Sequence, residues 1–416
     1  MEDIFISHIH INEVRHLKNI DIPLSEEKRQ HLILTGKNGS GKTSVLQELK
    51  LQFEQGIEKN GFVKIADNII AVAKMKRNIK NIDEGLFEGE QKDSNQLLEL
   101  FHTLTGNESE VQKYVNLNLT IQNIFGASQQ YQNGNFILAY FDAKRTTIAM
   151  HKPLTIQKLE LKSMYSISEK PSIDFIQYIV NLKADSSFAR DDNDMKAVKE
   201  VDNWFAQFEN SLKHIFNEKD LQLRFDRKNY NFDIVLNGHK AFDFTTLSDG
   251  YSAILSIVIE IMMRMENKSS RNYNIQGIVF IDEIETHLHI DLQKKILPFL
   301  TSFFPKIQFV VTTHSPFVLT SVDNAVIFDL EKQLKLENLS GYSSEAIVES
   351  YFESDKYSDI LKAQVKRYEW LLNLDNPTME QKDEIESLRA YFKQLPKFLA
   401  PELQLTINQL ELAQLV

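Results

Sequence analysis

One stretch of the chain has the residue types and spacing of a phosphate-binding loop. It runs from Gly36 to Thr43 and matches the pattern G-x-x-x-x-G-K-[ST] at every fixed position. Glycines let backbone N–H groups curl around phosphate oxygens, and a helix that begins near Lys42 points its positive end at the same anion. We expect Lys42 to reach the β- and γ-phosphates of a nucleotide and Thr43 to bind Mg²⁺. The predicted nucleotide contacts are Gly36, Asn38, Gly39, Ser40, Gly41, Lys42, Thr43 and Ser44.

Two acidic residues follow a predicted buried strand, which contains the four apolar residues 278–281. Such a run is typical of a strand inside a sheet. We expect Asp282 to lie beside the Mg²⁺ ion that Thr43 binds, and Glu283 to polarise the attacking water. A second acid in that role is typical of nucleotide hydrolases rather than of proteins that only bind nucleotides.

A histidine follows the next predicted strand, in the sequence VVTTHSPF. At this place His314 can hydrogen bond to a γ-phosphate and sense its loss. His287 and His289 lie close to Glu285, but their spacing suits neither a helical metal-binding pair nor the usual structural zinc patterns. We expect these two histidines to belong to a loop that shapes a contact between subunits.

Three further sets of polar residues have two interpretations each. Arg15 either contacts the nucleotide from an N-terminal hairpin or is an ordinary surface arginine. Asp142 and Arg145, at the tip of a predicted strand, line the Mg²⁺ site or an interface. The best basic cluster either contacts DNA or forms a solvated helix face, and it consists of Lys74, Lys76, Arg77 and Lys80.

The composition is that of an ordinary globular protein, with 42% hydrophobic and 25% charged residues among 416. The net charge of −11 argues against a protein that coats nucleic acid with its whole surface, although it allows a local basic patch. Zero cysteines exclude disulfides, cysteine–zinc sites and thiol chemistry. The N-terminus lacks a signal-peptide pattern, and the longest apolar stretch, 253–263, is too short to span a bilayer. We therefore expect a cytoplasmic protein with no membrane partner.

Strands that alternate with helices, and polar residues after the strands, predict an α/β core with a largely parallel sheet. An antiparallel pair of strands within residues 3–24 precedes the phosphate loop. The predicted organisation is one large domain over 1–335, followed by a helical region over 336–416 that contacts another subunit or a partner. The domain core covers mainly 1–54, 131–149 and 220–335, and helical insertions or lids cover 55–130 and 150–219.

A second loop of small residues, TTLSDGYSA, occupies positions 245–253, between the phosphate loop and the two acids. The phosphate loop, then LSDGY, FIDE and TTHS, resembles the ABC-type ATPase domain, although Asp249 and Tyr251 replace the more usual second glycine and glutamine. In that family two domains dimerise head to tail, and the signature loop of one closes over the γ-phosphate that the other binds. By this resemblance, Ser248 and Gly250 would bind ATP held by a second copy's Lys42, in a homodimer or a larger homo-oligomer.

Within that family, the sequence INEVRHLKNIDIPL near the N-terminus resembles the SMC and RecF-like DNA-maintenance ATPases. The segment 282–319 is more similar still to ATPases of bacterial anti-phage systems, namely OLD-family nucleases and the PtuA-like ATPases of Septu and certain retron systems. The resemblance implies an ATP- and Mg²⁺-dependent ATPase that acts as a sensor or regulatory subunit. OLD nucleases carry a Toprim domain, but the residues after 335 are too few and too helical for one. A nuclease or toxin effector would therefore be a separate protein.

Three other functions remain compatible with parts of the sequence. A RecF- or SMC-like DNA-repair ATPase would be stimulated by DNA or another nucleic acid. The ATPase subunit of a membrane transporter fits the core motifs but not the SMC-like N-terminus. An ATP-dependent dimerisation module with very slow hydrolysis would bind ATP equally well.

Overall fold

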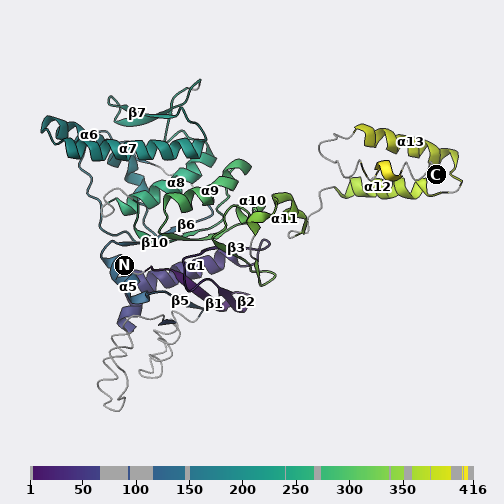
Figure 1. The fold of residues 1–416 in the computed structure, drawn as a ribbon, viewed down its shortest axis with the longest axis horizontal. Coiled ribbons are helices and arrows are strands. Elements are labelled where there is room, and N and C mark those ends of the chain that lie inside the picture. The colour runs from purple at the N-terminus through teal and green to yellow at the C-terminus, as the bar shows by residue number, and fades with distance from the viewer. Residues whose placement is uncertain are drawn as a thin grey trace, which may run out of the picture. The chain divides into compact units, whose positions relative to one another are not determined.

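The computed structural model describes residues 3–65, 92–93, 116–145, 150–238, 240–266, 273–336, 339–350, 358–374, 376–394, 405 and 407–410. The chain divides into two compact units, Met1–Ser343 and Ser344–Val416, and Figure 1 shows the fold of each. The predicted basic cluster at 74–80 and most of the predicted insertion at 55–130 lie outside the described residues.

Strands and helices alternate along much of the described chain. The strands are β1 (Ile6–Val14), β2 (Leu17–Pro23), β3 (His31–Thr35), β4 (Lys92–Asp93), β5 (Leu117–Ile121), β6 (Phe136–Phe141), β7 (Gln222–Asp226), β8 (Asn231–Val235), β9 (Phe242–Asp243), β10 (Gln276–Ile281), β11 (Ile307–Thr312), β12 (Ala325–Asp329) and β13 (Leu334–Leu336). The helices are α1 (Lys42–Phe53), α5 (Ile124–Gln132), α6 (Phe175–Asp191), α7 (Met195–Phe216), α8 (Asp249–Met265), α9 (Ile290–Phe303), α10 (Pro316–Leu319), α11 (Ser344–Ser350), α12 (Asp359–Leu372) and α13 (Met379–Gln394), with a π-helical turn η1 (Glu54–Glu58) and 3₁₀ turns η4 (Pro171–Asp174) and η5 (Leu339–Gly341).

A six-stranded sheet forms the centre of the first unit, in the order β13-β12-β3-β11-β10-β6. Neighbouring strands are parallel except for the edge pair β12–β13. Every residue of β3, β10 and β11 is buried, as expected for parallel strands covered by helices on both faces. Helix α1 covers one face, and α8 and α9 cover the other (Figure 1). The predicted α/β fold with a largely parallel sheet is confirmed.

A smaller antiparallel sheet, in the order β2-β1-β5-β4, packs on the far side of α1 (Figure 1). The predicted N-terminal pair of strands is confirmed as β1 and β2, which meet with Ile9 opposite Ile22. The two sheets are joined by buried amides, because the Gln308 side chain of β11 accepts from Ile6 N at 2.7 Å and donates to Ile6 O at 2.9 Å. Strand β1 is therefore bonded directly to β11 of the central sheet.

Strand β5 corrects one expectation of the sequence analysis. We expected residues 55–130 to be helical, but Leu117–Ile121 is a strand that pairs antiparallel with β1. Its residues alternate between buried and half-buried, and the Gln52 side chain of α1 donates to Leu117 O at 2.6 Å. The pairing partner lies more than a hundred residues earlier in the chain, so the short alternating run gave little local indication of it.

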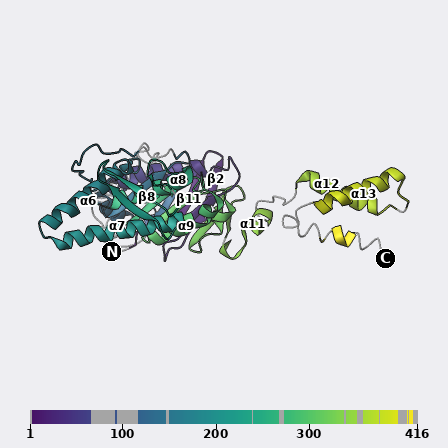
Figure 2. The ribbon, with the colours of Figure 1, turned by 90° about the horizontal axis from the view of Figure 1, so that it is seen from above.

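Helices α6 and α7 lie side by side over α8 (Figures 1 and 2). One aromatic residue from each of these helices and Tyr273, which precedes β10, surround one buried carboxylate at the end of α8. Glu266 accepts hydrogen bonds from Tyr178 (2.5 Å), Trp204 (2.8 Å) and Tyr273 (2.6 Å). These bonds satisfy a charged group that would otherwise be costly to bury. They also hold the C-terminal end of α8 in place.

The second unit has a small hydrophobic core of its own between α12 and α13. Tyr368 and Phe392 meet edge to face with ring centroids 5.3 Å apart, and Leu372 and Ile407 complete the buried cluster. Arg367 and Glu384 join the two helices by an ion pair of 2.8 Å. Both helices therefore contribute residues to the hydrophobic core and to the ion pair of this unit.

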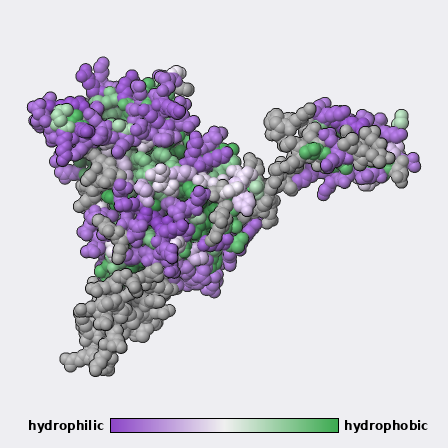
Figure 3. Space-filling view, viewed as in Figure 1, coloured by the Kyte–Doolittle hydropathy of each residue, from purple (hydrophilic) through white to green (hydrophobic). Residues whose placement is uncertain are grey.

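The visible face of the first unit is mostly hydrophilic, and its apolar residues appear in small areas (Figure 3). Large exposed apolar side chains do occur in this unit, such as Leu154 and Ile156 in the segment before η4. None of the described helices combines the length and the apolar character that crossing a membrane requires.

Candidate active site

The phosphate loop connects the end of β3 to the start of α1. Three of its glycines have positive φ, namely Gly36 (131°), Gly39 (85°) and Gly41 (97°), which residues with a side chain rarely adopt. The Lys42 ammonium lies inside the loop, where it donates to the carbonyls of Gly36 (2.9 Å) and Lys37 (3.1 Å). The N-cap of α1 is Gly41, which provides no capping side chain, so the first N–H groups of the helix can bind an anion.

The remaining predicted loop contacts follow from the same geometry. Ser40 is buried and its hydroxyl lies 3.5 Å from the Lys42 ammonium, whereas Asn38 is exposed at the tip. Thr43 and Ser44 form the first turn of α1 together with Lys42. A phosphate group bound in the loop would therefore meet a cation, a helix N-terminus and hydroxyl groups at once.

The turn between β1 and β2 packs against this loop. A Cβ atom on Gly41 would come within 2.7 Å of Leu17 Cδ1, which explains why this position needs a glycine. Arg15 occupies the same turn with φ 56°, and its side chain is exposed. The structure therefore places Arg15 in the turn beside the phosphate loop, but without a described contact to it.

Asp282 is only 2% exposed and lies beside Thr43. Its Oδ1 atom accepts hydrogen bonds from the hydroxyls of Thr43 (3.2 Å) and Thr312 (2.6 Å). The Thr312 hydroxyl also accepts from Glu283 N at 2.7 Å, so this residue of β11 connects both acids. The oxygen atoms of Thr43 and Asp282 are of the type that Mg²⁺ prefers, and these two residues fit the ion.

Burial and neighbouring charges shift the pKa values of Lys42 and His314. Burial lowers the pKa of the Lys42 ammonium, and the carboxylates of Glu283, Glu285 and Asp282 partly oppose this effect. Burial also lowers the pKa of His314, and the Lys42 charge lowers it further. A histidine shifted in this direction is mostly neutral at pH 7, so one ring nitrogen can donate a hydrogen bond while the other accepts.

Glu285 has a position that the sequence analysis did not predict. Its carboxylate accepts from His314 N at 2.6 Å and from the Thr313 hydroxyl at 2.8 Å, so it holds the loop that carries His314. His287 and His289, which stand near it in the sequence, are exposed. The only local signal for this role of Glu285 was its nearness to the two acids.

Glu285→Gln is expected to lower kcat for ATP hydrolysis about tenfold. The neutral amide weakens two hydrogen bonds to a charged acceptor, and a loss of roughly 1.4 kcal/mol corresponds to a factor of ten in rate. Phosphate release at saturating ATP measures the effect, with Glu200→Gln on the exposed side of α7 as the control. An unchanged kcat would show that the loop of His314 does not depend on this carboxylate.

The predicted signature residues lie at the start of α8, on the face of the central sheet opposite α1 (Figure 1). Ser248 is the N-cap residue and is exposed, but its hydroxyl makes no capping hydrogen bond. Asp249 is exposed as well. A Cβ atom on Gly250 would lie 3.0 Å from the carbonyl oxygen of His287, so glycine permits close packing on the loop after the acids. These residues are not brought together with the phosphate loop of their own chain.

The loop before Ser248 is held by Asp243. The Asp243 Oδ1 atom accepts from Thr245 N (2.9 Å) and from the Thr245 hydroxyl (2.7 Å), and Oδ2 accepts from Lys152 (2.5 Å) and Asn231 (2.8 Å). Burial alone would raise the pKa of the Asp243 carboxyl, but these hydrogen bonds outweigh burial and lower it. The carboxylate is therefore charged at pH 7 and keeps all four bonds.

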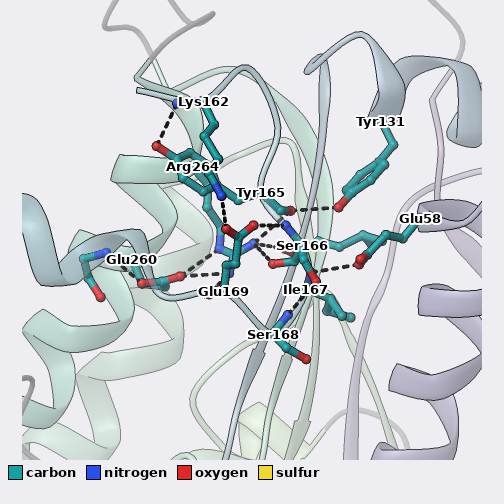
Figure 4. A network of polar contacts seen from close by, with 12 residues as sticks. Glu58, Tyr131, Lys162, Tyr165, Ser166, Ile167, Ser168, Glu169, Glu260 and Arg264 are labelled. Atoms are coloured by element: carbon teal, nitrogen blue, oxygen red, sulfur yellow. Dashed lines mark hydrogen bonds and ion pairs between the residues drawn. The ribbon is translucent and has the colours of Figure 1, made fainter. Parts of the chain in front are cut away.

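The other end of α8 is tied to the central sheet by a buried network (Figure 4). The Arg264 side chain, 2% exposed, pairs with Glu260 at 2.9 Å and donates to Leu138 O at 2.6 Å. It also donates to the carbonyls of Ser166 and Glu169 in the segment that precedes η4. Because Leu138 belongs to β6, the helix that begins at the signature residues is bonded to the strand beside β10.

Residues 5–319 match the family model of the AAA ATPase domain. The chain belongs to this family. The match covers the phosphate loop, the signature segment, the acid pair and His314. The protein is an ATP-binding ATPase.

Several known proteins are similar to this ATPase. The Septu protein PtuA of Bacillus mycoides (strain KBAB4) is 26% identical over 400 residues, which cover 92% of this chain and 50% of PtuA. The probable ATPase of retron Ec83 from Escherichia coli is 34% identical over 141 residues, 31% of this chain and 26% of that protein. The probable ATPase of retron Vc95 from Vibrio cholerae serotype O1 biovar El Tor is 34% identical over 166 residues, 37% of this chain and 32% of that protein.

The chain spans about half the length of PtuA and less of the two retron ATPases. Among solved structures, an SMC head bound to the C-winged helix domain of ScpA covers 81% of this chain and 100% of its own, with a TM-score of 0.40 and 13% identity. The predicted resemblance to Septu and retron ATPases is confirmed.

Proposed function

We propose that this ATPase is the regulatory subunit of a bacterial anti-phage system and controls a separate nuclease or toxin effector. The observation that carries the proposal is the similarity to Septu PtuA over 92% of the chain. The motif order and the retron relatives support it. In this proposal the protein works in the cytoplasm, where ATP is available.

ATP binds to the phosphate loop in this proposal, with Lys42 at the β- and γ-phosphates. Thr43 and Asp282 would hold Mg²⁺, since their oxygen atoms already lie 3.2 Å apart. When bound there, the ion neutralises charge on the phosphate oxygens. Glu283 is half-buried one residue after Asp282, and it accepts the proton of the attacking water. Neutral His314 donates a hydrogen bond to the γ-phosphate.

Two copies complete each other's sites in this proposal. The exposed Ser248 hydroxyl and the positive end of α8 would face the γ-phosphate held by Lys42 of the second copy. Gly250 has no side chain, so the backbone there can approach the phosphate, and Arg15 would contact the nucleotide from the β1–β2 turn. The assembly is a homodimer or a larger homo-oligomer, and α12 and α13 of the second unit contact another subunit or the effector.

Phage plating on cells that carry this gene and its neighbours tests the proposal. We expect plating of sensitive phages to fall at least about a hundredfold, only when both this ATPase and a neighbouring effector gene are present. Lys42→Ala should abolish protection because it removes the phosphate-binding cation, whereas Lys28→Ala, an exposed residue outside the site, should not.

Protection that persists without this gene would exclude the regulatory role. ATP hydrolysis that rises severalfold with duplex DNA, together with repair defects in a deletion strain, would favour the alternative of a RecF- or SMC-like DNA-maintenance ATPase.

A further inference from the structure

Arg145 lies a few residues after β6 and reaches across to the acids at the end of β10. Its Nη2 atom donates to the carbonyl oxygens of Asp282 (2.9 Å) and Glu283 (2.5 Å), and Nη1 donates to the carbonyl of Ile284 (3.2 Å). One guanidinium therefore holds three consecutive backbone carbonyls. The planar fork of arginine provides this geometry, and the single ammonium of lysine does not.

The N–H groups of the same three residues donate to the neighbouring strands, and that of Glu283 bonds to the Thr312 hydroxyl at 2.7 Å. Asp282 N donates to Phe141 O at 2.9 Å, and Ile284 N donates to Thr312 O at 3.1 Å. The acid segment has left the regular ladder of β10 here, so its carbonyls need another donor, because buried carbonyls are costly without one. Arg145 is that donor for the carbonyls of Asp282 and Ile284, and it shares the Glu283 carbonyl with Thr286 N, which donates to it at 3.0 Å.

Glu283 has an unusual backbone conformation within this segment. Its φ is 45°, in the left-handed region that residues with a side chain occupy at a cost of about 1–2 kcal/mol. Such conformations persist where the surroundings impose them. Without the bonds from Arg145, the peptide groups on both sides of Glu283 could rotate and direct its side chain elsewhere.

The guanidinium of Arg145 is positively charged at neutral pH. Burial lowers the pKa of its guanidinium to about 10, although Glu285, Asp282 and Glu283 oppose the shift. The group is therefore protonated throughout the neutral range, and all of its N–H donors remain available.

We propose that Arg145 is a positioning residue for ATP hydrolysis, which keeps the Glu283 backbone in its left-handed conformation and thereby aims the Glu283 carboxylate at the attacking water. The proposal rests on the role proposed for Glu283. Within the described part of the chain, the side chain of Arg145 donates to backbone carbonyls of the acid segment and therefore acts through Glu283.

Measurements of kcat and of ATP affinity in Arg145→Gln test this inference. Lys144→Gln, which changes the adjacent exposed cation in the same way, is the matched control. We expect Arg145→Gln to lower kcat about 30-fold, in the range of a misplaced catalytic group. The affinity for ATP, measured by fluorescence with hydrolysis suppressed by EDTA, should stay within about threefold because the phosphate loop is untouched. Lys144→Gln should match the wild type in both measurements.

A double variant separates positioning from a general effect on the fold. If Arg145 acts through Glu283, then Arg145→Gln combined with Glu283→Gln should be no slower than Glu283→Gln alone. Rates that multiply, or an ATP affinity that falls together with kcat, would overturn the inference. Arg145→Lys, which retains a buried cation, should fold as the wild type and still lose most of kcat; full activity in Arg145→Lys would also overturn it.

The two levels of the proposal can fail separately. If Glu283→Gln loses hydrolysis while Arg145→Gln retains it, the positioning role is wrong and the role of Glu283 stands. If Glu283→Gln retains full hydrolysis, the role of Glu283 itself is wrong.

Discussion

Glu283→Gln is expected to lower kcat for ATP hydrolysis by about a thousandfold and to leave ATP binding within about threefold of the wild type. Glutamine has the shape of glutamate but cannot accept the proton of the attacking water, and general-base catalysis contributes about 10²–10⁴ in rate. The left-handed backbone at this position is compatible with either side chain, and the hydrogen bond from the Glu283 N–H to Thr312 does not involve the carboxylate. The loss should therefore be one of chemistry and not of folding.

Phosphate release at saturating ATP and equilibrium ATP binding together measure this effect. Glu200→Gln, a change of the same type at an exposed position of α7, is the control and should behave as the wild type. If both Glu283→Gln and the wild type release phosphate at the same negligible rate while binding ATP, the protein would be an ATP-dependent dimerisation module with hydrolysis too slow to matter.

Ser248→Arg is expected to weaken ATP-driven association at least about a hundredfold, while each monomer still binds ATP. The exposed N-cap of α8 is the surface that faces the second nucleotide in the proposed dimer, and a long charged side chain there leaves no space for close approach. Helix α1, which the phosphate loop precedes, lies on the opposite face of the central sheet, so ATP binding within the monomer is not disturbed (Figure 1).

Light scattering with and without ATP, in the Glu283→Gln background that preserves the nucleotide, gives the mass of the assembly. Ser187→Arg on the exposed face of α6 is the matched control, and it should associate as the parent protein does. ATP-dependent association that survives in Ser248→Arg would exclude the head-to-tail arrangement. Loss of association in both variants would indicate a general effect of the added charge.

The parts of the fold that the sequence predicts are those with a local signal. The phosphate loop joins a fully buried strand to a helix, and the two acids follow another buried strand. Parallel strands inside a sheet have long apolar runs and end at a common edge, so the order of Lys42, Asp282 and His314 along the chain was enough to predict that they meet. The structure brings these three residues together.

The parts that the sequence does not predict depend on long-range contacts. The sequence analysis assigned Arg145 to the Mg²⁺ site or an interface, but it did not predict the bonds to three backbone carbonyls, one of which belongs to Asp282, 137 residues away. The same is true of Thr312, whose hydroxyl is shared by two acids from a neighbouring strand. Such contacts depend on which strands are neighbours in the sheet. The local periodicity of the sequence does not determine that order.

The way α8 is held has a consequence for the conformational entropy of association. Every residue from Ser252 to Met265 is buried, Arg264 bonds one end to β6, and Asp243 orders the loop before Ser248. Ordering a mobile residue costs about 1–2 kcal/mol, so a flexible signature loop of several residues would oppose binding strongly. The bonds to Asp243 and Arg264 order the flanks of this loop within one chain, so in the proposed dimer the affinity between two copies would depend mainly on the contacts that they form.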